Sequence, residues 1–240
     1  MTVLVVCSSD YYVQEYYLKL QRLAGARYTL MENKLDPARL PARDSVRRRR
    51  TDDTLTIGYF GLLRCPTSWD FLRRLAEEGE GRVRVVAAGL PTGIDTIERD
   101  VAESPFLEYL GPYVSPDALP DLYGRGDLVW ALDPYGVPNG RWARTNRYYE
   151  AGYFRRPMIV QRGTPDGFEV ERADVGLAID LGSPDEAVRG ILGVTQARLG
   201  EWEGNLDEID VATFTMTDDY ERVIDELIDA EGTCLRLRSC

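Results

Sequence analysis

A helix start that combines cations with one carboxylate offers the clearest chemistry in this sequence. Thr145 can cap a helix whose first turn holds Asn146 and Arg147, and Glu150 follows about one turn later. The positive end of such a helix, with an arginine beside it, suits a diphosphate. The carboxylate further in can accept hydrogen bonds from ribose hydroxyls. The simpler alternative is a surface helix in which Thr145 is only a cap and Glu150 pairs with Arg147 or Arg156.

A glycine turn after an apolar segment is the second candidate for a phosphate contact. Gly61 follows a strand expected over residues 55–60, and Arg64 stands before a helix expected over residues 68–78. Glycine lets the backbone approach a ligand, and the start of the next helix offers free N–H groups to a phosphate. The segment is neither a G-x-G-x-x-G nor a Walker loop, so an ordinary turn is the simpler explanation when it is taken alone.

Two further strand ends place an aromatic residue beside a glycine. Gly111 and Tyr113 follow a strand expected over residues 106–110, and residues 133–136 (Asp-Pro-Tyr-Gly) follow one expected over residues 128–132. An aromatic ring and exposed backbone amides at a strand end can hold a planar base, although such tyrosines more often complete a core.

Short apolar strands alternate strictly with amphipathic helices from residue 55 onward. Because these strands are apolar throughout, they predict a parallel sheet buried on both faces, which is a doubly wound, Rossmann-like α/β fold. Ligands bind such sheets at the carboxyl ends of the strands, near the point where the strand order reverses. The expected strands cover residues 55–60, 83–88, 106–110, 128–132, 158–161 and 177–179, and the expected helices cover residues 68–78 (capped by Thr67 or Ser68), 92–103, 117–123, 145–154 and 185–199.

Shorter elements flank this region on both sides. Residues 3–7 predict a strand, residues 11–23 a helix rich in tyrosine, and residues 28–31 a second strand. Residues 33–53 contain two prolines and no periodicity, and they indicate a linker. Near the end of the chain, residues 218–231 have the apolar stripe of an amphipathic helix.

Composition excludes several classes of function. The net charge of -11 argues against a nucleic-acid partner, because such proteins neutralise phosphates with clustered cations. The chain has no histidine, which removes Ser-His-Asp triads and most zinc chemistry. We expect no metal, since arginines and backbone amides can neutralise phosphates, and we expect no cofactor. With 44% hydrophobic residues among 240, the chain is expected to bury a core rather than to be disordered.

The sequence also favours a cytoplasmic location. The apolar run at the N-terminus is short and lacks a basic leader, so it indicates a strand rather than a signal peptide. The four cysteines are widely spaced and resemble reduced cytosolic thiols, and a link between Cys234 and Cys240 is the alternative. The run of arginines at residues 47–50 is interpreted as a solvated linker, and peripheral contact with an anionic membrane is its less economical alternative.

Taken in order, these segments resemble the C-terminal, donor-binding half of GT-B-fold glycosyltransferases, particularly the retaining, group 1-like enzymes that use nucleotide-sugar donors. The resemblance spans most of the chain and depends on the order of its motifs. They are a hinge (residues 32–36), a strand with a glycine turn (57–61), a Y-x-G-x-V strand end (109–114), a strand start (124–128) and a helix start similar to P-N-K-x-y-E-y (145–151).

The resemblance implies a role for each candidate residue. Glu150 would bind the ribose, while Thr145, Asn146, Arg147 and the Gly61 turn would face the diphosphate with help from Arg64. Gly111 and Tyr113 would lie beside the base. The family's additional glutamate, eight positions before the ribose glutamate, is replaced here by Trp142.

The same resemblance predicts how the chain is divided. Residues 1–31 would be a stub of the acceptor-binding N-terminal half, residues 32–53 a hinge, residues 54–200 the nucleotide-sugar-binding domain and residues 201–240 a helical tail. The expected function is binding of a nucleotide-diphosphate sugar, with sugar transfer requiring a missing N-terminal half or a partner. The alternatives are a non-catalytic binding or assembly module, which would dimerise or bind a partner, and, less favoured, a sugar-nucleotide epimerase.

Overall fold

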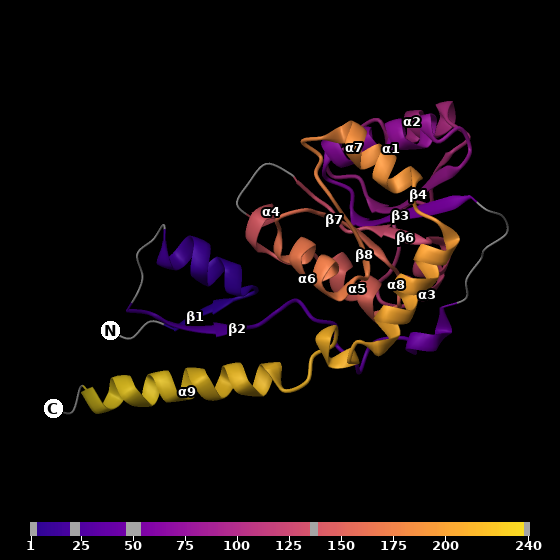
Figure 1. Ribbon diagram of the computed structural model, residues 1–240. Coiled ribbons are helices and arrows are strands. Elements are labelled where there is room, and N and C mark those ends of the chain that lie inside the picture. Colours follow the sequence, from indigo (N-terminus) through magenta and orange to yellow (C-terminus); the bar gives the residue numbers. More distant parts are fainter. Residues whose placement is uncertain (1–3, 20–24, 47–53, 135–138, 238–240) are drawn as a thin grey trace.

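The computed structural model in Figure 1 describes residues 4–19, 25–46, 54–134 and 139–237. It consists of a larger α/β part, built on a six-stranded sheet, and a small layer of two strands that is covered by the long C-terminal helix. Within these described ranges, no helix is both long enough and apolar enough to cross a lipid bilayer.

The six-stranded sheet is parallel throughout and confirms the predicted doubly wound fold. Its strand order is β5-β4-β3-β6-β7-β8, so the order reverses between β3 and β6. The strands are β3 (Leu55–Leu62), β4 (Val83–Leu90), β5 (Leu107–Tyr109), β6 (Leu128–Trp130), β7 (Met158–Gln161) and β8 (Gly176–Ile179). A crevice is expected at the carboxyl ends of β3 and β6, where the neighbouring connections leave in opposite directions.

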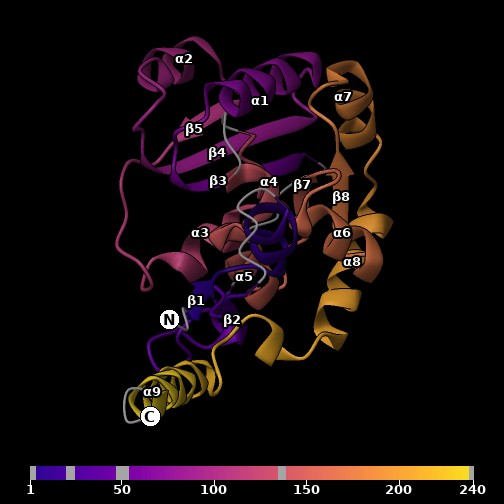
Figure 2. The same cartoon turned by 90° about the vertical axis from the view of Figure 1, so that its left-hand side faces the viewer.

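Helices cover both faces of this sheet (Figures 1 and 2). Apolar side chains of one face pack against α1 (Pro66–Glu78), α2 (Ile97–Glu103) and α7 (Pro184–Leu192). The opposite face packs against α3 (Leu119–Arg125), α5 (Asn146–Tyr153) and α6 (Pro165–Ala173). A short helix, α4 (Asn139–Trp142), precedes α5.

The prediction of one helix over residues 185–199 is wrong. The chain forms two helices, α7 and α8 (Gln196–Glu208), separated at Gly193 and capped anew by Thr195, whose hydroxyl accepts a hydrogen bond from the Arg198 N–H. Helix α8 also continues across residues 200 and 201, the expected boundary between domain and tail. Its Leu199 and Trp202 pack into the core of the sheet. The division into domains itself remains a prediction.

Other predicted boundaries shift for identifiable reasons. Strand β3 extends through Gly61 to Leu62, since this glycine continues the pairing with β4. Helix α1 is capped by Cys65, whose sulfur accepts from the Ser68 N–H at 3.4 Å, and not by Thr67 or Ser68. Helix α2 begins only at residue 97 rather than at residue 92.

Helix α6 was not expected from the sequence at all. It begins with Pro165, has Gly167 in its first turn and is capped by the Thr164 hydroxyl, which accepts from the Gly167 N–H at 3.1 Å. Proline and glycine so close together usually indicate a turn, whereas proline in the first turn of a helix is well tolerated.

The N-terminal part forms a separate small layer. Strands β1 (Leu4–Cys7) and β2 (Arg27–Leu30) pair in parallel, and the π-helix η1 (Tyr12–Leu18) occupies the middle of the helix expected over residues 11–23. The end of that expected helix lies outside the described residues. Helix α9 (Asp219–Leu237) runs along β1 and β2, as both views show (Figures 1 and 2).

Polar contacts hold α9 on this layer. The guanidinium of Arg222 donates to the Thr29 hydroxyl at 2.8 Å and to the Leu30 carbonyl at 2.6 Å. Since Thr29 is buried and Leu30 ends β2, these bonds fix the first turn of α9 against the strand.

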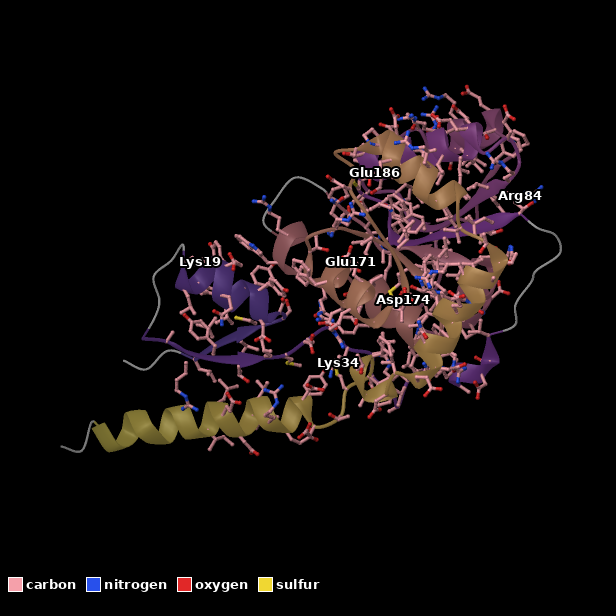
Figure 3. All side chains as sticks on the ribbon, viewed as in Figure 1. Lys19, Lys34, Arg84, Glu171, Asp174 and Glu186 are labelled. Carbon is pink, nitrogen blue, oxygen red and sulfur yellow. The ribbon has the colours of Figure 1, made fainter. Side chains whose placement is uncertain are left out.

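The predicted hinge is tied to the larger part of the molecule. Leu35 forms a β-bridge with Thr215, and Lys34 lies where the two parts meet (Figure 3). In the 3-10 helix η2 (Arg43–Ser45), the Arg43 guanidinium donates to the Tyr153 carbonyl at 2.7 Å. The arginine run at residues 47–50, and with it the alternative of membrane contact, lies outside the described residues.

Candidate functional site

Two glycines are paired near the ends of β3 and β4, where one of them has no room for a side chain. Gly61 and Gly89 are paired in register, and both have positive φ angles, 103° and 133°. A Cβ atom on Gly89 would overlap the Gly61 carbonyl oxygen. On its other side Gly61 faces Tyr113, whose hydroxyl oxygen would lie 4.0 Å from a Cβ atom placed on Gly61. The glycine turn and the tyrosine therefore border the same space.

The segment after β5 completes this border. Gly111 has a φ of 79° and accepts a hydrogen bond from the Gly89 N–H at 2.9 Å, and a Cβ atom here would meet nothing within 4 Å. The pKa of Tyr113 is raised to about 12, mainly by burial and also by the charge of Glu150, while the charge of Arg147 opposes the rise. Glu150 and Arg147 are thus close enough to Tyr113 for their charges to act on its hydroxyl.

Helix α5 begins as the sequence predicts. The Thr145 hydroxyl accepts from the Tyr148 N–H at 3.2 Å, and the Thr145 N–H donates to Asp166 Oδ2 at 3.0 Å. The N–H groups of Asn146 and Arg147 lie in the first turn, where an α-helix supplies no carbonyl partner. The Asn146 side chain is exposed.

Arg147 is buried beneath the end of β6. Its guanidinium donates to the Trp130 carbonyl at 3.1 Å and lies over the Tyr59 ring, 5.0 Å from its centroid. A second nitrogen lies 3.5 Å from Asp133 Oδ2. These contacts hold a permanent positive charge at the point where the strand order reverses.

Arg64 shares the same carboxylate. Its Nε donates to Asp133 Oδ2 at 2.8 Å, and its side chain is 53% exposed whereas that of Asp133 is 5% exposed. We call these three residues the Arg64–Asp133–Arg147 cluster. In the part of the chain that the structure describes, Oδ1 of Asp133 is buried and has no hydrogen-bond partner.

A buried tyrosine forms a hydrogen bond with the Glu150 carboxylate. The Tyr123 hydroxyl donates to Glu150 Oε2 at 2.6 Å. Burial raises the pKa of Glu150, and this hydrogen bond and the charge of Arg147 oppose the rise. Arg156, the alternative partner of Glu150, donates instead to the Tyr123 carbonyl at 2.7 Å and lies 3.5 Å from Glu203. Glu150 therefore does not form the ion pair with Arg156 that the surface-helix alternative offers.

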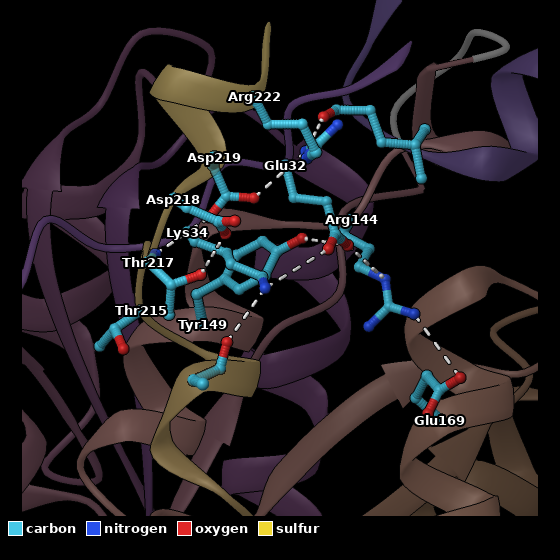
Figure 4. A network of polar contacts seen from close by, with 12 residues as sticks. Glu32, Lys34, Arg144, Tyr149, Glu169, Thr215, Thr217, Asp218, Asp219 and Arg222 are labelled. Atoms are coloured by element: carbon cyan, nitrogen blue, oxygen red, sulfur yellow. Dashed lines mark hydrogen bonds and ion pairs between the residues drawn. The ribbon is translucent and has the colours of Figure 1, made fainter. Parts of the chain in front are cut away.

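A second polar network joins the hinge to the helices (Figure 4). Arg144 lies 3.6 Å from both Glu32 and Glu169, and the Tyr149 hydroxyl donates to Glu32 at 3.0 Å. A pocket of about 400 Å³ opens beside it and is lined by Glu32, Lys34, Arg144, Tyr148, Glu169, Asp210, Ala212 and Thr213. No pattern in the sequence predicts this pocket.

Three residues of the site were not assigned a role from the sequence: Asp133, Tyr123 and Asp166. Asp133 had a usable signal, because it is a carboxylate directly after a buried strand at the carboxyl edge of the sheet. Tyr123 and Asp166 act through partners far away in the sequence, which no local pattern reveals. Among the described residues, no cluster of three Cys, Asp or Glu side chains could hold a metal ion.

Comparison with known sequences gives one informative relative. No family model matches the chain. It is 29% identical over 201 residues to the succinoglycan biosynthesis protein ExoL of Rhizobium meliloti (strain 1021), a match that covers 79% of this chain and 48% of ExoL. The chain thus spans about half the length of this curated relative.

Solved structures share the fold at low sequence identity. HepE of Anabaena, crystallised with UDP and glucose, has a TM-score of 0.64 at 14% identity and matches 93% of this chain and 62% of its own. WaaG, a glycosyltransferase involved in lipopolysaccharide biosynthesis, has a TM-score of 0.63 at 14% identity, with 87% and 60% covered.

The sucrose-phosphate synthase of Thermosynechococcus elongatus has a TM-score of 0.61 at 14% identity, with 95% of this chain and 59% of the synthase covered. These structures are GT-B glycosyltransferases. The resemblance predicted from the sequence is confirmed at the level of the fold: the chain has a six-stranded, Rossmann-like half of the GT-B glycosyltransferase architecture.

Proposed function

We propose that this chain is the donor-binding part of a glycosyltransferase and that it binds a nucleotide-diphosphate sugar at the carboxyl edge of its sheet. One observation carries the proposal. Gly61, Tyr113, Arg147 and Glu150 come from three separate segments and lie near one another beside the strand-order reversal. Ligands of doubly wound sheets bind at this position. The UDP and UDP-glucose complexes of HepE support the choice of ligand class.

The diphosphate would lie at the start of α5. The first-turn N–H groups of Asn146 and Arg147 point out of the helix end, and the helix dipole adds positive potential there. Arg147 and the half-exposed Arg64, which both contact Oδ2 of Asp133, contribute full charges. The backbone at Gly61 is free of a side chain, so a phosphate can approach it closely.

The nucleoside would lie between Glu150 and the segment after β5. Tyr123 occupies Oε2 of Glu150, which leaves Oε1 to accept a hydrogen bond from a ribose hydroxyl. The space beside Gly111 is open, and Tyr113 supplies a ring against which a planar base can pack.

Sugar transfer would further need an acceptor-binding part that covers the small N-terminal layer. Sheet β1–β2 has only two strands, and α9 exposes an apolar stripe on its outer side. Unpaired strand edges and contiguous apolar patches favour association. The same surface supports the alternative of an assembly module that dimerises. The exposed residues are Val6 of β1 and Tyr220, Ile224, Leu227 and Ile228 of α9.

Calorimetric titration with a panel of nucleoside diphosphates tests the proposed ligand. We expect the wild type to bind one member and Glu150→Ala to bind it at least about tenfold more weakly. Glu171→Ala, which removes an exposed carboxylate of α6 (labelled in Figure 3), serves as the control and should bind like the wild type. Absence of binding by the wild type to every member of the panel would overturn the proposal.

Light scattering after size-exclusion chromatography tests the exposed surface. We expect wild-type chain to self-associate or to bind an acceptor part, and Ile224→Glu with Leu227→Glu to abolish that association while nucleotide binding persists. A wild type that stays monomeric at high concentration and retains no co-purified partner would count against the surface.

A further inference from the structure

Asp133 places a negative charge between the two arginines that would bind the diphosphate. We propose that Asp133 is a specificity-determining residue, an internal counter-ion that makes this site favour a nucleotide sugar over the free nucleoside diphosphate. This inference rests on the proposed function, since it assumes that the diphosphate lies beside the Arg64–Asp133–Arg147 cluster.

Asp133 contacts both arginines of the proposed diphosphate site directly, and it does not act through other residues. A single oxygen, Oδ2, serves both cations, at 2.8 Å from Arg64 Nε and 3.5 Å from the Arg147 guanidinium. The carboxylate therefore occupies a position that a phosphate oxygen would otherwise take between two guanidinium groups.

The other oxygen shows that the carboxylate is not fully satisfied. Oδ1 is buried without a hydrogen-bond partner, and so is the hydroxyl of Tyr59, in the part of the chain that the structure describes. The nearby Cys65 thiol is only a weak donor toward this carboxylate. Burial raises the pKa of Cys65 most, and the charge of Asp133 and a hydrogen bond to it raise that pKa further. A buried carboxylate with one unpaired oxygen is costly. Asp133 is thus poorly explained as a purely structural residue.

A nucleotide sugar and a nucleoside diphosphate differ in the charge of the diphosphate, which is the group proposed to lie beside Asp133. The diphosphate of a nucleotide sugar is esterified at both ends, whereas a nucleoside diphosphate ends in a free phosphate. Since the second pKa of such a phosphate is about 6, it carries roughly one additional negative charge at neutral pH. The cluster holds two positive charges and one negative charge, so this additional charge is opposed by the carboxylate at short range.

Replacing Asp133 with a neutral residue should therefore increase the affinities for the two ligands by different factors. We expect Asp133→Asn to bind the nucleoside diphosphate about tenfold more tightly than the wild type, and the nucleotide sugar no more than about threefold more tightly. Affinity for the uncharged nucleoside should not change. If Asp133 served only to position Arg64 and Arg147, its removal would weaken binding of both charged ligands.

The experiment is calorimetric titration with matched pairs, such as UDP-glucose and UDP with uridine as the neutral probe, and the corresponding guanine and adenine compounds. Asp185→Asn is the matched control, because it removes an exposed aspartate that pairs with Arg74 and changes the net charge equally. Asp133→Ser is a second variant. Its smaller neutral side chain tests the same charge removal in case the asparagine amide does not fit the buried position. Thermal unfolding confirms that each variant is folded.

The outcomes separate this inference from the proposed function. If the wild type binds no ligand pair, the proposed function fails, and this inference fails with it. If the wild type binds but Asp133→Asn and Asp133→Ser bind the nucleoside diphosphate equally or more weakly, only the role of Asp133 is overturned. The role of Asp133 would also be overturned if its replacement increased the affinities for both charged ligands equally. The same holds if Asp185→Asn increased the affinity for the nucleoside diphosphate as much as Asp133→Asn does.

Discussion

The hydroxyl of Tyr123 donates a 2.6 Å hydrogen bond to Oε2 of Glu150, which joins α3 to α5 behind the crevice. Burial raises the pKa of Tyr123 well above its usual value, so the hydroxyl remains a donor at any physiological pH. Its ring packs between Phe60 and Phe154, with centroids 5.3 Å from each. The core of the sheet thereby sets the orientation of the Glu150 carboxylate, for which we propose a contact with the ribose.

This relationship gives Tyr123→Phe a specific effect. The variant keeps the ring packing but leaves Glu150 free to rotate, and we expect nucleotide affinity to fall by roughly three- to tenfold, the net value of one ordinary hydrogen bond. Calorimetry measures the change. Tyr153→Phe, which removes a hydroxyl bonded to the Pro41 carbonyl, is the matched control. Equal affinities of the two variants would contradict an orienting role for Tyr123.

The two arginines of the cluster should differ in their importance for stability. Arg147→Ala leaves Asp133 buried with one cation fewer and leaves the Trp130 carbonyl without its donor, so we expect a loss of about 3 kcal/mol in the free energy of unfolding. Arg64 is half-exposed, and Arg64→Ala should cost less than about 1 kcal/mol. Urea unfolding measures both values. Similar losses in the two variants would show that Arg147 is not the structural anchor.

Much of the site could be predicted because its signals are local. The Thr145 cap, the first turn of α5 and the strand before Gly61 each depend on residues within a few positions of one another, and the structure confirms them. The parallel sheet also followed from uniformly apolar strands, which only a two-sided burial explains. Local sequence therefore sufficed to place the elements that border the crevice.

The remainder depends on contacts between distant segments. Arg64 meets Asp133 across 69 positions, and no local pattern reveals that pairing. The break between α7 and α8 was missed because Gly193 stands inside an otherwise amphipathic pattern, where glycine is tolerated as often as it ends a helix. The close approach of Gly89 to Gly61 arises from strand register, which becomes visible only when β3 and β4 are paired.

That close approach makes Gly89 and Gly111 a useful pair of positions. Both have positive φ, so alanine costs about 1 kcal/mol or more at either one. At Gly89 the new methyl group would also overlap the Gly61 carbonyl, while at Gly111 it would meet open space. We expect Gly89→Ala to lose at least about 3 kcal/mol of stability and Gly111→Ala about 1 kcal/mol. Thermal unfolding distinguishes them, and a smaller loss for Gly89→Ala would contradict the packing of the two strands.

A final expectation concerns the buried Asp166, which holds the Thr145 N–H at the start of α5. Burial raises the pKa of Asp166 to about 6, and the Thr145 hydrogen bond and the charges of Arg144 and Arg147 only partly oppose the rise. The folded protein therefore holds this proton more tightly than the unfolded chain does. The stabilisation that protonation provides is complete below the usual aspartate pKa and is lost as the pH rises through about 6.

Asp166→Asn isolates this effect, because the amide cannot ionise but can still accept the Thr145 N–H bond. As the pH falls from about 7 to about 5, we expect the wild type to gain roughly 1 kcal/mol of unfolding free energy relative to the variant. At neutral pH the amide replaces a buried, incompletely paired charge, so the variant should be at least as stable as the wild type. Urea unfolding at the two pH values gives the difference, in which all other titrations cancel. The difference in unfolding free energy between wild type and variant could instead stay constant, or shift toward the variant, as the pH falls. Either result would show that Asp166 is not held as a protonated acid.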